Sequence, residues 1–263
     1  MSKLKDIFPW FTLAIYLVVI LSFIAAKRNE ITCNEIKVSI TDNSSNFFIE
    51  EEDVISLLSD KGEQLISKPI ESINVNKLEE LLSLHPSVKK ANVYRNLNGI
   101  LEIQISQRTP MLRVINNSNE SYYLDEDGAV MPLSNKYAAH VLVASGNIRE
   151  KYATWSKVKL KEYAPEIVEN SNPLLLDLFT LADYIYHDKF WNAQIEQIYV
   201  VGNEFELIPR VGTQIIRFGG IAEYNEKFKK LKALYEQGMP QTGWNKYKTI
   251  NLKYKNQVIC TKR

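Results

Sequence analysis

The sequence predicts an α+β protein with a single N-terminal transmembrane helix, a small β-α-α-β-β module, and a mixed β-sheet domain with two flanking helices. Three observations predict this class. The chain opens on a long apolar run, residues 31–109 mix helical and alternating hydrophobic patterns, and alternating patterns dominate from residue 110 onward. We place a tail at residues 1–6, the helix at 7–26, the first domain at 27–109 and the second at 110–263.

The apolar run from Ile7 to Ala26 contains no Asp, Glu, Lys, Arg or His. As a helix it would extend about 30 Å, which is the thickness of the hydrocarbon core of a bilayer. A cleaved signal peptide is the alternative, but its apolar region usually spans about 7–15 residues. In addition, Ile24-Ala25-Ala26 is a poor match to a small-x-small cleavage site. We therefore expect an uncleaved anchor, with a cytoplasmic N-terminus and exported domains.

Composition argues against several classes of function. The chain has 32 Lys and Arg against 31 Asp and Glu, so its net charge gives no reason to expect nucleic-acid binding. Its two cysteines are Cys33, close to the expected membrane anchor, and Cys260, close to the C-terminus. We expect no disulfide between them and, without a ligand cluster, no structural zinc site.

The first domain is expected to fold as strand, helix, helix, strand, strand. Its acidic run, residues 50–53, suits the first turn of a helix because the helix dipole favours negative charge there. Pro86 ends the second helix, and the last strand alternates apolar and polar residues. The expected elements are Glu35–Ile40, Glu50–Ser59, Asn76–Leu84, Lys90–Arg95 and Gly99–Ser106.

The second domain is richer in strands. A helix is marked by Asn172 as its N-cap and Pro173 at its first position, and a second helix is expected over Ala222–Gln237. The expected strands before the C-terminal hairpin are Met111–Ile115, Ser121–Leu124, Val141–Ala144, Gln194–Val201, Glu204–Pro209 and Gln214–Phe218.

The chain ends in a predicted hairpin. Apolar residues alternate from Ile250 to Tyr254, and Lys255-Asn256 is a plausible two-residue turn. This turn would pair Leu252 with Ile259. The register turns Ile259 toward the core, and Val258 and Cys260 away from it.

No catalytic signature occurs in the sequence. It contains no His-Glu-x-x-His, no Gly-x-Ser-x-Gly and no phosphate-binding glycine loop. The acidic residues Asp125, Glu126 and Asp127 precede Gly128 between apolar stretches, so a turn explains them better than acid–base chemistry. We therefore expect no enzymatic activity, no cofactor, no catalytic metal and no small-molecule substrate.

Several short motifs follow one another in an order that resembles a known family. They are His85-Pro86-Ser87-Val88, Gln107-Arg108-Thr109-Pro110, Tyr123-Leu124-Asp125 with Gly128, Met131-Pro132-Leu133-Ser134, Phe218-Gly219 and Ile250-Asn251-Leu252-Lys253-Tyr254. Together they resemble the FtsQ/DivIB family of bacterial cell-division proteins, in the style of its Bacteroidetes branch. The first module is similar to a POTRA domain.

The resemblance implies a non-catalytic scaffold of the divisome, held in the inner membrane at the division septum with its domains in the periplasm. It implies that the POTRA module serves recruitment and that the last strands receive the partners FtsB and FtsL. A terminal strand with unpaired backbone groups can accept a partner strand. The candidate partner-binding residues are Tyr254, Gln257, Val258, Ile259, Cys260, Thr261 and Lys262.

Two other functions stay open. A POTRA-bearing protein could serve polypeptide export or outer-membrane assembly, binding transiting chains rather than a stable partner. A tethered enzyme would need a catalytic constellation that forms only in three dimensions.

Overall fold

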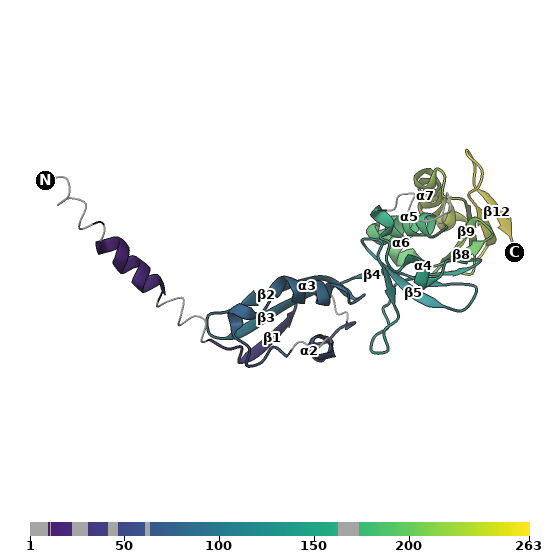
Figure 1. Cartoon of the computed structure of the whole chain (residues 1–263). Helices are drawn as coiled ribbons and strands as arrows, with labels where there is room; N and C mark the ends of the chain where they lie inside the picture. The colour runs from purple at the N-terminus through teal and green to yellow at the C-terminus, as the bar shows by residue number, and fades with distance from the viewer. Residues whose placement is uncertain (1–9, 11, 23–30, 42–46, 61–63, 163–173) are drawn as a thin grey trace. The chain divides into compact units, whose positions relative to one another are not determined.

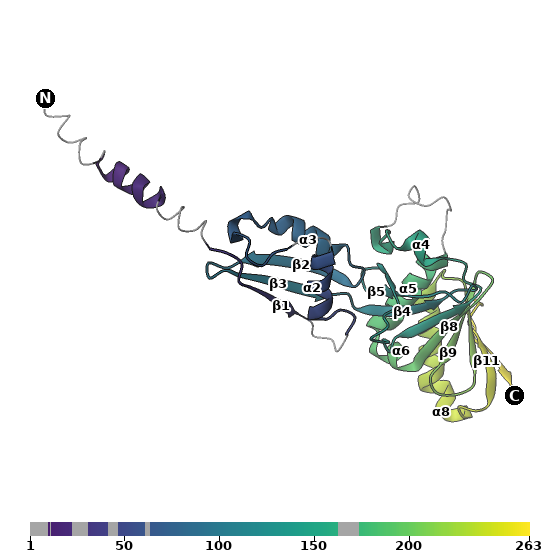
Figure 2. The ribbon, with the colours of Figure 1, turned by 60° about the horizontal axis from the view of Figure 1, so that its bottom comes forward.

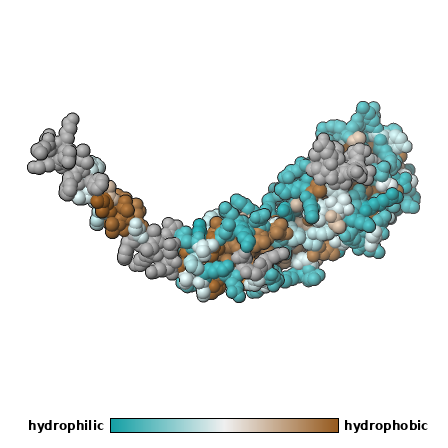
Figure 3. Space-filling view, viewed as in Figure 1, coloured by the Kyte–Doolittle hydropathy of each residue, from teal (hydrophilic) through white to brown (hydrophobic). Residues whose placement is uncertain are grey.

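The computed structural model describes residues 10, 12–22, 31–41, 47–60, 64–162 and 174–263. The chain divides into two compact units, Met1–Gln107 and Arg108–Arg263, which are described separately (Figure 1). Residues 12–22 are helical, and Figure 3 shows this segment in brown, the colour of hydrophobic residues. Among the described residues no helix combines the length and the hydropathy that crossing a bilayer requires. The expected span at 7–26 lies partly outside these residues, so it stays a prediction.

The first unit has the strand–helix–helix–strand–strand order expected from the sequence. Its three-stranded sheet has the order β1-β3-β2, with β1 parallel to β3 and β2 antiparallel to it. The elements are β1 (Glu35–Ile40), α2 (Glu51–Asp60), the short 3-10 helix η1 (Ile70–Ser72), α3 (Val75–Ser83), β2 (Val88–Arg95) and β3 (Ile100–Gln107).

One face of this small sheet is covered by the two helices. Leu58 of α2 and Leu82 of α3 share a core with Leu101 and Ile103 of β3, and all four are at most 2% exposed. The helix α3 begins where its N-cap, Asn74, accepts a hydrogen bond from the backbone of Lys77 at 3.2 Å. The alternating apolar pattern therefore predicted this unit well.

The second unit is built on one nine-stranded sheet, in the order β12-β11-β10-β9-β8-β7-β4-β5-β6. Figure 2 shows the strands in sequence across this sheet from β5 through β4, β8 and β9 to β11. Its strands are β4 (Pro110–Ile115), β5 (Ser121–Asp125), β6 (Val130–Pro132), β7 (Leu142–Gly146), β8 (Ile195–Val201), β9 (Glu204–Pro209), β10 (Ile215–Gly219), β11 (Tyr247–Asn251) and β12 (Ile259–Lys262).

The helices of this unit lie between strands in the sequence, and both α5 and α7 supply buried residues to the core. Leu178 of α5 and Phe228 of α7 are buried with Leu207 of β9 and Ile250 of β11. The helical elements are α4 (Tyr152–Trp155), η2 (Leu160–Glu162), α5 (Leu174–His187), α6 (Lys189–Gln194), α7 (Tyr224–Ala233), the π-helical turn η3 (Leu234–Gly238) and α8 (Met239–Thr242).

The sequence-based expectations hold for most elements of this unit, with local differences. The predicted cap and first turn at Asn172 and Pro173 lie outside the described residues, and α5 is described from Leu174. The short elements β6, α4, α6 and α8 were not predicted. Of these, α6 has a signal in the sequence, because Asp188 is a favourable N-cap residue. Its carboxylate accepts hydrogen bonds from the backbone of Phe190 and Trp191 at 2.8 and 3.1 Å.

The acidic run at residues 125–127 forms a turn, as expected. One carboxylate oxygen of Asp125 accepts from the backbone of Asp127 and Ala129 at 2.9 and 2.7 Å. The other accepts from the guanidinium of Arg108 at 2.8 Å, and the two side chains are only 2% and 15% exposed. This buried ion pair joins the start of the second unit to the turn after β5.

We expect Arg108→Met to lower the free energy of unfolding of the second unit by about 3–5 kcal/mol, because it leaves the Asp125 carboxylate buried without its cation. Lys159→Met is the matched control. It breaks the exposed Lys159–Glu162 pair and should cost less than about 1 kcal/mol. Urea unfolding of the full chain in detergent, followed by tryptophan fluorescence, measures the difference, because three of the four tryptophans lie in this unit. Equal losses in the two variants would contradict this account of Asp125.

Candidate partner-binding edge

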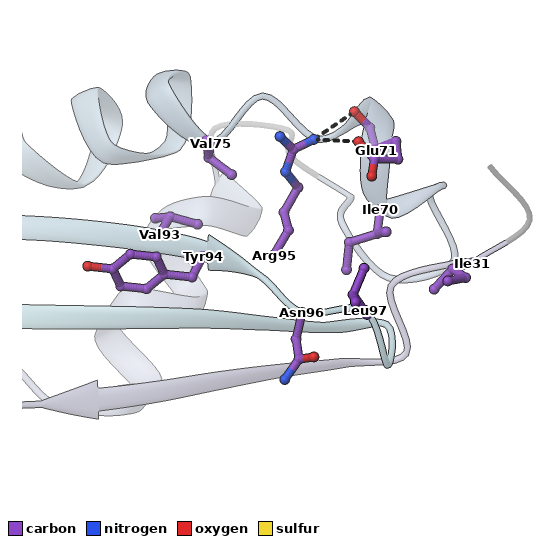
Figure 4. A pocket seen from close by; sticks show the side chains of 9 residues that line it. All are labelled: Ile31, Ile70, Glu71, Val75, Val93, Tyr94, Arg95, Asn96 and Leu97. Atoms are coloured by element: carbon purple, nitrogen blue, oxygen red, sulfur yellow. Dashed lines mark hydrogen bonds and ion pairs between the residues drawn. The ribbon is translucent and has the colours of Figure 1, made fainter. Parts of the chain in front are cut away.

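A pocket of about 310 Å³ lies in the first unit, and the two charged residues of its lining, Glu71 and Arg95, pair with each other. Its walls combine apolar and polar side chains, and Figure 4 shows the side chain of Arg95 directed toward Glu71. The guanidinium of Arg95 bonds to the Glu71 carboxylate and backbone oxygens at 3.3 and 3.0 Å. Its lining residues are Ile31, Ile70, Glu71, Val75, Val93, Tyr94, Arg95, Asn96 and Leu97. Within the described ranges no group of His, Cys, Asp or Glu is arranged to hold a metal ion.

The last strand, β12, forms one margin of the nine-stranded sheet. It pairs antiparallel with β11, which in turn pairs parallel with β10. Because β12 comes first in the strand order, β11 is its one neighbour among the strands that the structure describes. One row of its backbone N–H and C=O groups is therefore open to another strand.

The direction of each backbone group along β12 follows from one hydrogen bond. The N–H of Arg263 donates to the carbonyl of Lys246 at 3.2 Å, so the backbone groups of Arg263 point toward β11. Backbone groups of successive residues in a strand point to opposite edges. The backbone N–H and C=O groups of Ile259 and Thr261 therefore also point to β11. Those of Cys260 and Lys262 point to the open edge.

Two protein families match the chain, one over each unit. Residues 109–261 match the family described as FtsQ/DivIB, C-terminal related, and residues 31–106 match the POTRA-like domain. The chain belongs to the FtsQ/DivIB family. Comparison with curated proteins gives no match. Both halves of the resemblance drawn from the sequence are thus confirmed, and in this family member the open strand is the last one of the matched C-terminal region.

The register predicted for the terminal hairpin is wrong by one residue. Ile259 pairs with Asn251, and Cys260 pairs with Ile250, whereas the sequence pattern predicts that Ile259 pairs with Leu252. The cause is the connection: β11 ends at Asn251, and residues 252–258 form a seven-residue link in place of a two-residue turn. A one-residue slip exchanges the faces of every side chain in the strand.

This slip reverses the predicted directions on β12. Cys260 shares a face with the fully buried Ile250 and packs against the core, whereas Ile259 is 40% exposed on the opposite face. Val258 also packs against the core, contrary to the expectation. Of the other candidates of this FtsQ-family edge, Thr261 and Lys262 are exposed on the strand, and Tyr254 and Gln257 are exposed on the link before it.

One residue of this region was missed by the sequence analysis. Lys230 of α7 reaches the link between β11 and β12, and its ammonium donates to the carbonyls of Leu252, Tyr254 and Lys255 at 3.4, 2.6 and 3.3 Å. In the sequence it belongs to a run of four lysines, at positions 227, 229, 230 and 232. Nothing in that run separates Lys230 from its neighbours, because the link it contacts is more than 20 residues away.

The observed register predicts that a thiol at position 259 reacts faster than the thiol of Cys260. Burial raises the pKa of the Cys260 thiol, so it should react slowly with a maleimide near neutral pH. In an Ile259→Cys, Cys260→Ser variant the new thiol lies on the exposed face and should react roughly tenfold faster.

Mass spectrometry of the labelled, folded chain distinguishes these sites from Cys33, which is fully buried. Faster labelling of Cys260 than of the thiol introduced at position 259 would restore the register predicted from the sequence.

Proposed function

We propose that this protein is a membrane-anchored, non-catalytic scaffold of the bacterial divisome, and that it receives a partner by strand addition to β12. The observation that carries the proposal is the open edge of β12, at the end of the region that matches the FtsQ/DivIB family. Family membership supports a division-related scaffold role. The identity of the partner and the use of this edge are our proposals.

Strand addition explains how so small an edge can bind. A partner in extended conformation would bond to the outward backbone groups of Cys260 and Lys262, while alternate side chains would contact Ile259 and Thr261 on the exposed face. We name FtsB and FtsL as the partners, as the family resemblance implies. The POTRA-like domain would serve recruitment by other division proteins.

Charge favours an acidic partner at this edge. Residues 246–263 contain six Lys or Arg residues and no Asp or Glu, although the chain as a whole is nearly neutral. Lys262 and Arg263 lie at the open end of β12. Such a cluster raises the association rate with an acidic segment more than it raises the affinity, and added salt weakens the effect.

Localisation follows from the proposed anchor. The apolar run at 7–26 would hold the protein in the inner membrane, with both domains in the periplasm and concentrated at the division septum. The hydropathy of the sequence supports this proposal, as does the family.

Lys262→Pro should weaken binding of the FtsB–FtsL complex about tenfold, because it removes an N–H donor from the open edge and the ring obstructs a neighbouring strand. The fold should persist, since the N–H of Lys262 does not point toward β11. Surface-immobilised full chain in nanodiscs, titrated with the FtsB–FtsL complex of the same bacterium, measures the affinity.

The matched control is Lys262→Ala, which loses the same charge but keeps the backbone donor. It should bind nearly as well as the unaltered chain at moderate salt. If a folded Lys262→Pro protein binds as tightly as Lys262→Ala, strand addition at this edge is rejected.

A functional fluorescent fusion should form a ring at midcell, and depletion of the protein should give filamentous, undivided cells. The POTRA-like domain also suits the second candidate, a polypeptide export or outer-membrane assembly factor. Normal division together with misassembled outer-membrane proteins after depletion would favour that second function.

A further inference from the structure

The link between β11 and β12 has little burial of its own to hold it. Leu252 at its start is fully buried, and its N–H bonds to the carbonyl of Arg217 at 2.9 Å. The next five residues, 253–257, are all exposed. An exposed link of this length costs backbone entropy to order, so polar contacts must supply the restraint.

Lys230 is placed to supply that restraint. An ammonium group has three N–H donors, and in this protein its nitrogen lies within hydrogen-bond distance of three carbonyl oxygens of the link. The helix that carries it is fixed in the core through Phe228 and Leu231, which are at most 1% exposed. The side chain thus connects a rigid element to the segment that sets the position of the edge strand.

The other charged contacts of the link join side chains to each other, unlike the contacts of Lys230 with the backbone. Lys253 pairs with Glu204 of β9, and Lys255 pairs with Glu223 at 3.6 Å. Both are pairs between partly exposed side chains, and contacts of this kind contribute little and are screened by salt. The Lys230 bonds instead reach the backbone itself, so they restrain the path of the chain.

We propose that Lys230 is a positioning residue for the partner-binding edge: it holds the β11–β12 link in place and so orders β12 before a partner arrives. This inference rests on the proposed function of β12. A strand of four residues, paired on one side and with a register shift between Tyr247 and Thr249, has few bonds of its own. A preorganised edge spares the partner the cost of ordering it.

Hydrogen–deuterium exchange on the unbound full chain in nanodiscs tests the inference without any partner. Lys230→Met should speed exchange of residues 252–263 severalfold and leave β8 and the melting temperature unchanged. Lys229→Met is the matched control on the same helix, since Lys229 is exposed and pairs with Glu226. Equal exchange of residues 252–263 in the two variants would overturn the inference.

Affinity for the FtsB–FtsL complex then tests the consequence for binding. Ordering the backbone of one residue costs a free energy that corresponds to about a tenfold loss of affinity. Lys230→Met should therefore bind about tenfold more weakly than Lys229→Met. Lys230→Arg, which retains a cation with several donors, should recover much of the loss.

The two proposals fail in different ways. If the unaltered chain does not bind FtsB–FtsL, the proposed function is wrong, whatever the exchange rates show. If the unaltered chain binds and Lys230→Met binds equally well, the positioning role of Lys230 is wrong.

Discussion

The parallel pairing of β11 with β10 is the constraint on which the candidate edge depends. Two parallel neighbours cannot be joined by a tight turn, so the chain must cross over between them. The crossover is supplied by α7, the π-helical turn and α8, and it packs Phe228 and Leu231 onto the sheet. β11 is thereby added beyond β10, and the final hairpin places β12 outside it. The same helix that buries the sheet also brings Lys230 to the link.

Local patterns were sufficient to predict most elements but not the order of the strands. In the first unit, alternation in β3 and the spacing of leucines in α3 predicted the elements and their order to within one or two residues. In the second unit, each strand gives the same kind of signal wherever it lies in the sheet. That β12 is at the margin depends on nine strands taking one order, which no short segment encodes.

The error in the terminal hairpin has a specific cause. Ile250, Leu252 and Tyr254 alternate as if one strand ran through all three, but the strand ends at Asn251. Leu252 stays buried because the chain remains beside β10 after its pairing with β12 has ended: the N–H of Leu252 donates to the carbonyl of Arg217. Burial in the link therefore imitates the pattern of a strand. Lys230 could not be predicted for a related reason, since its role depends on a contact across more than 20 residues.

The open margin of the sheet has a further consequence, for self-association. Backbone groups that accept a foreign strand can equally accept the same strand from a second molecule, and long, flat, apolar margins do so readily. Here the strand is four residues long, ends at Lys262, is followed by Arg263, and has a register shift in its pairing with β11. Two such margins brought together would share only a very short ladder, and each copy would bring the positive charges of Lys262 and Arg263 to it. The features that limit the area of this candidate edge thus also disfavour a dimer formed by pairing two copies of β12.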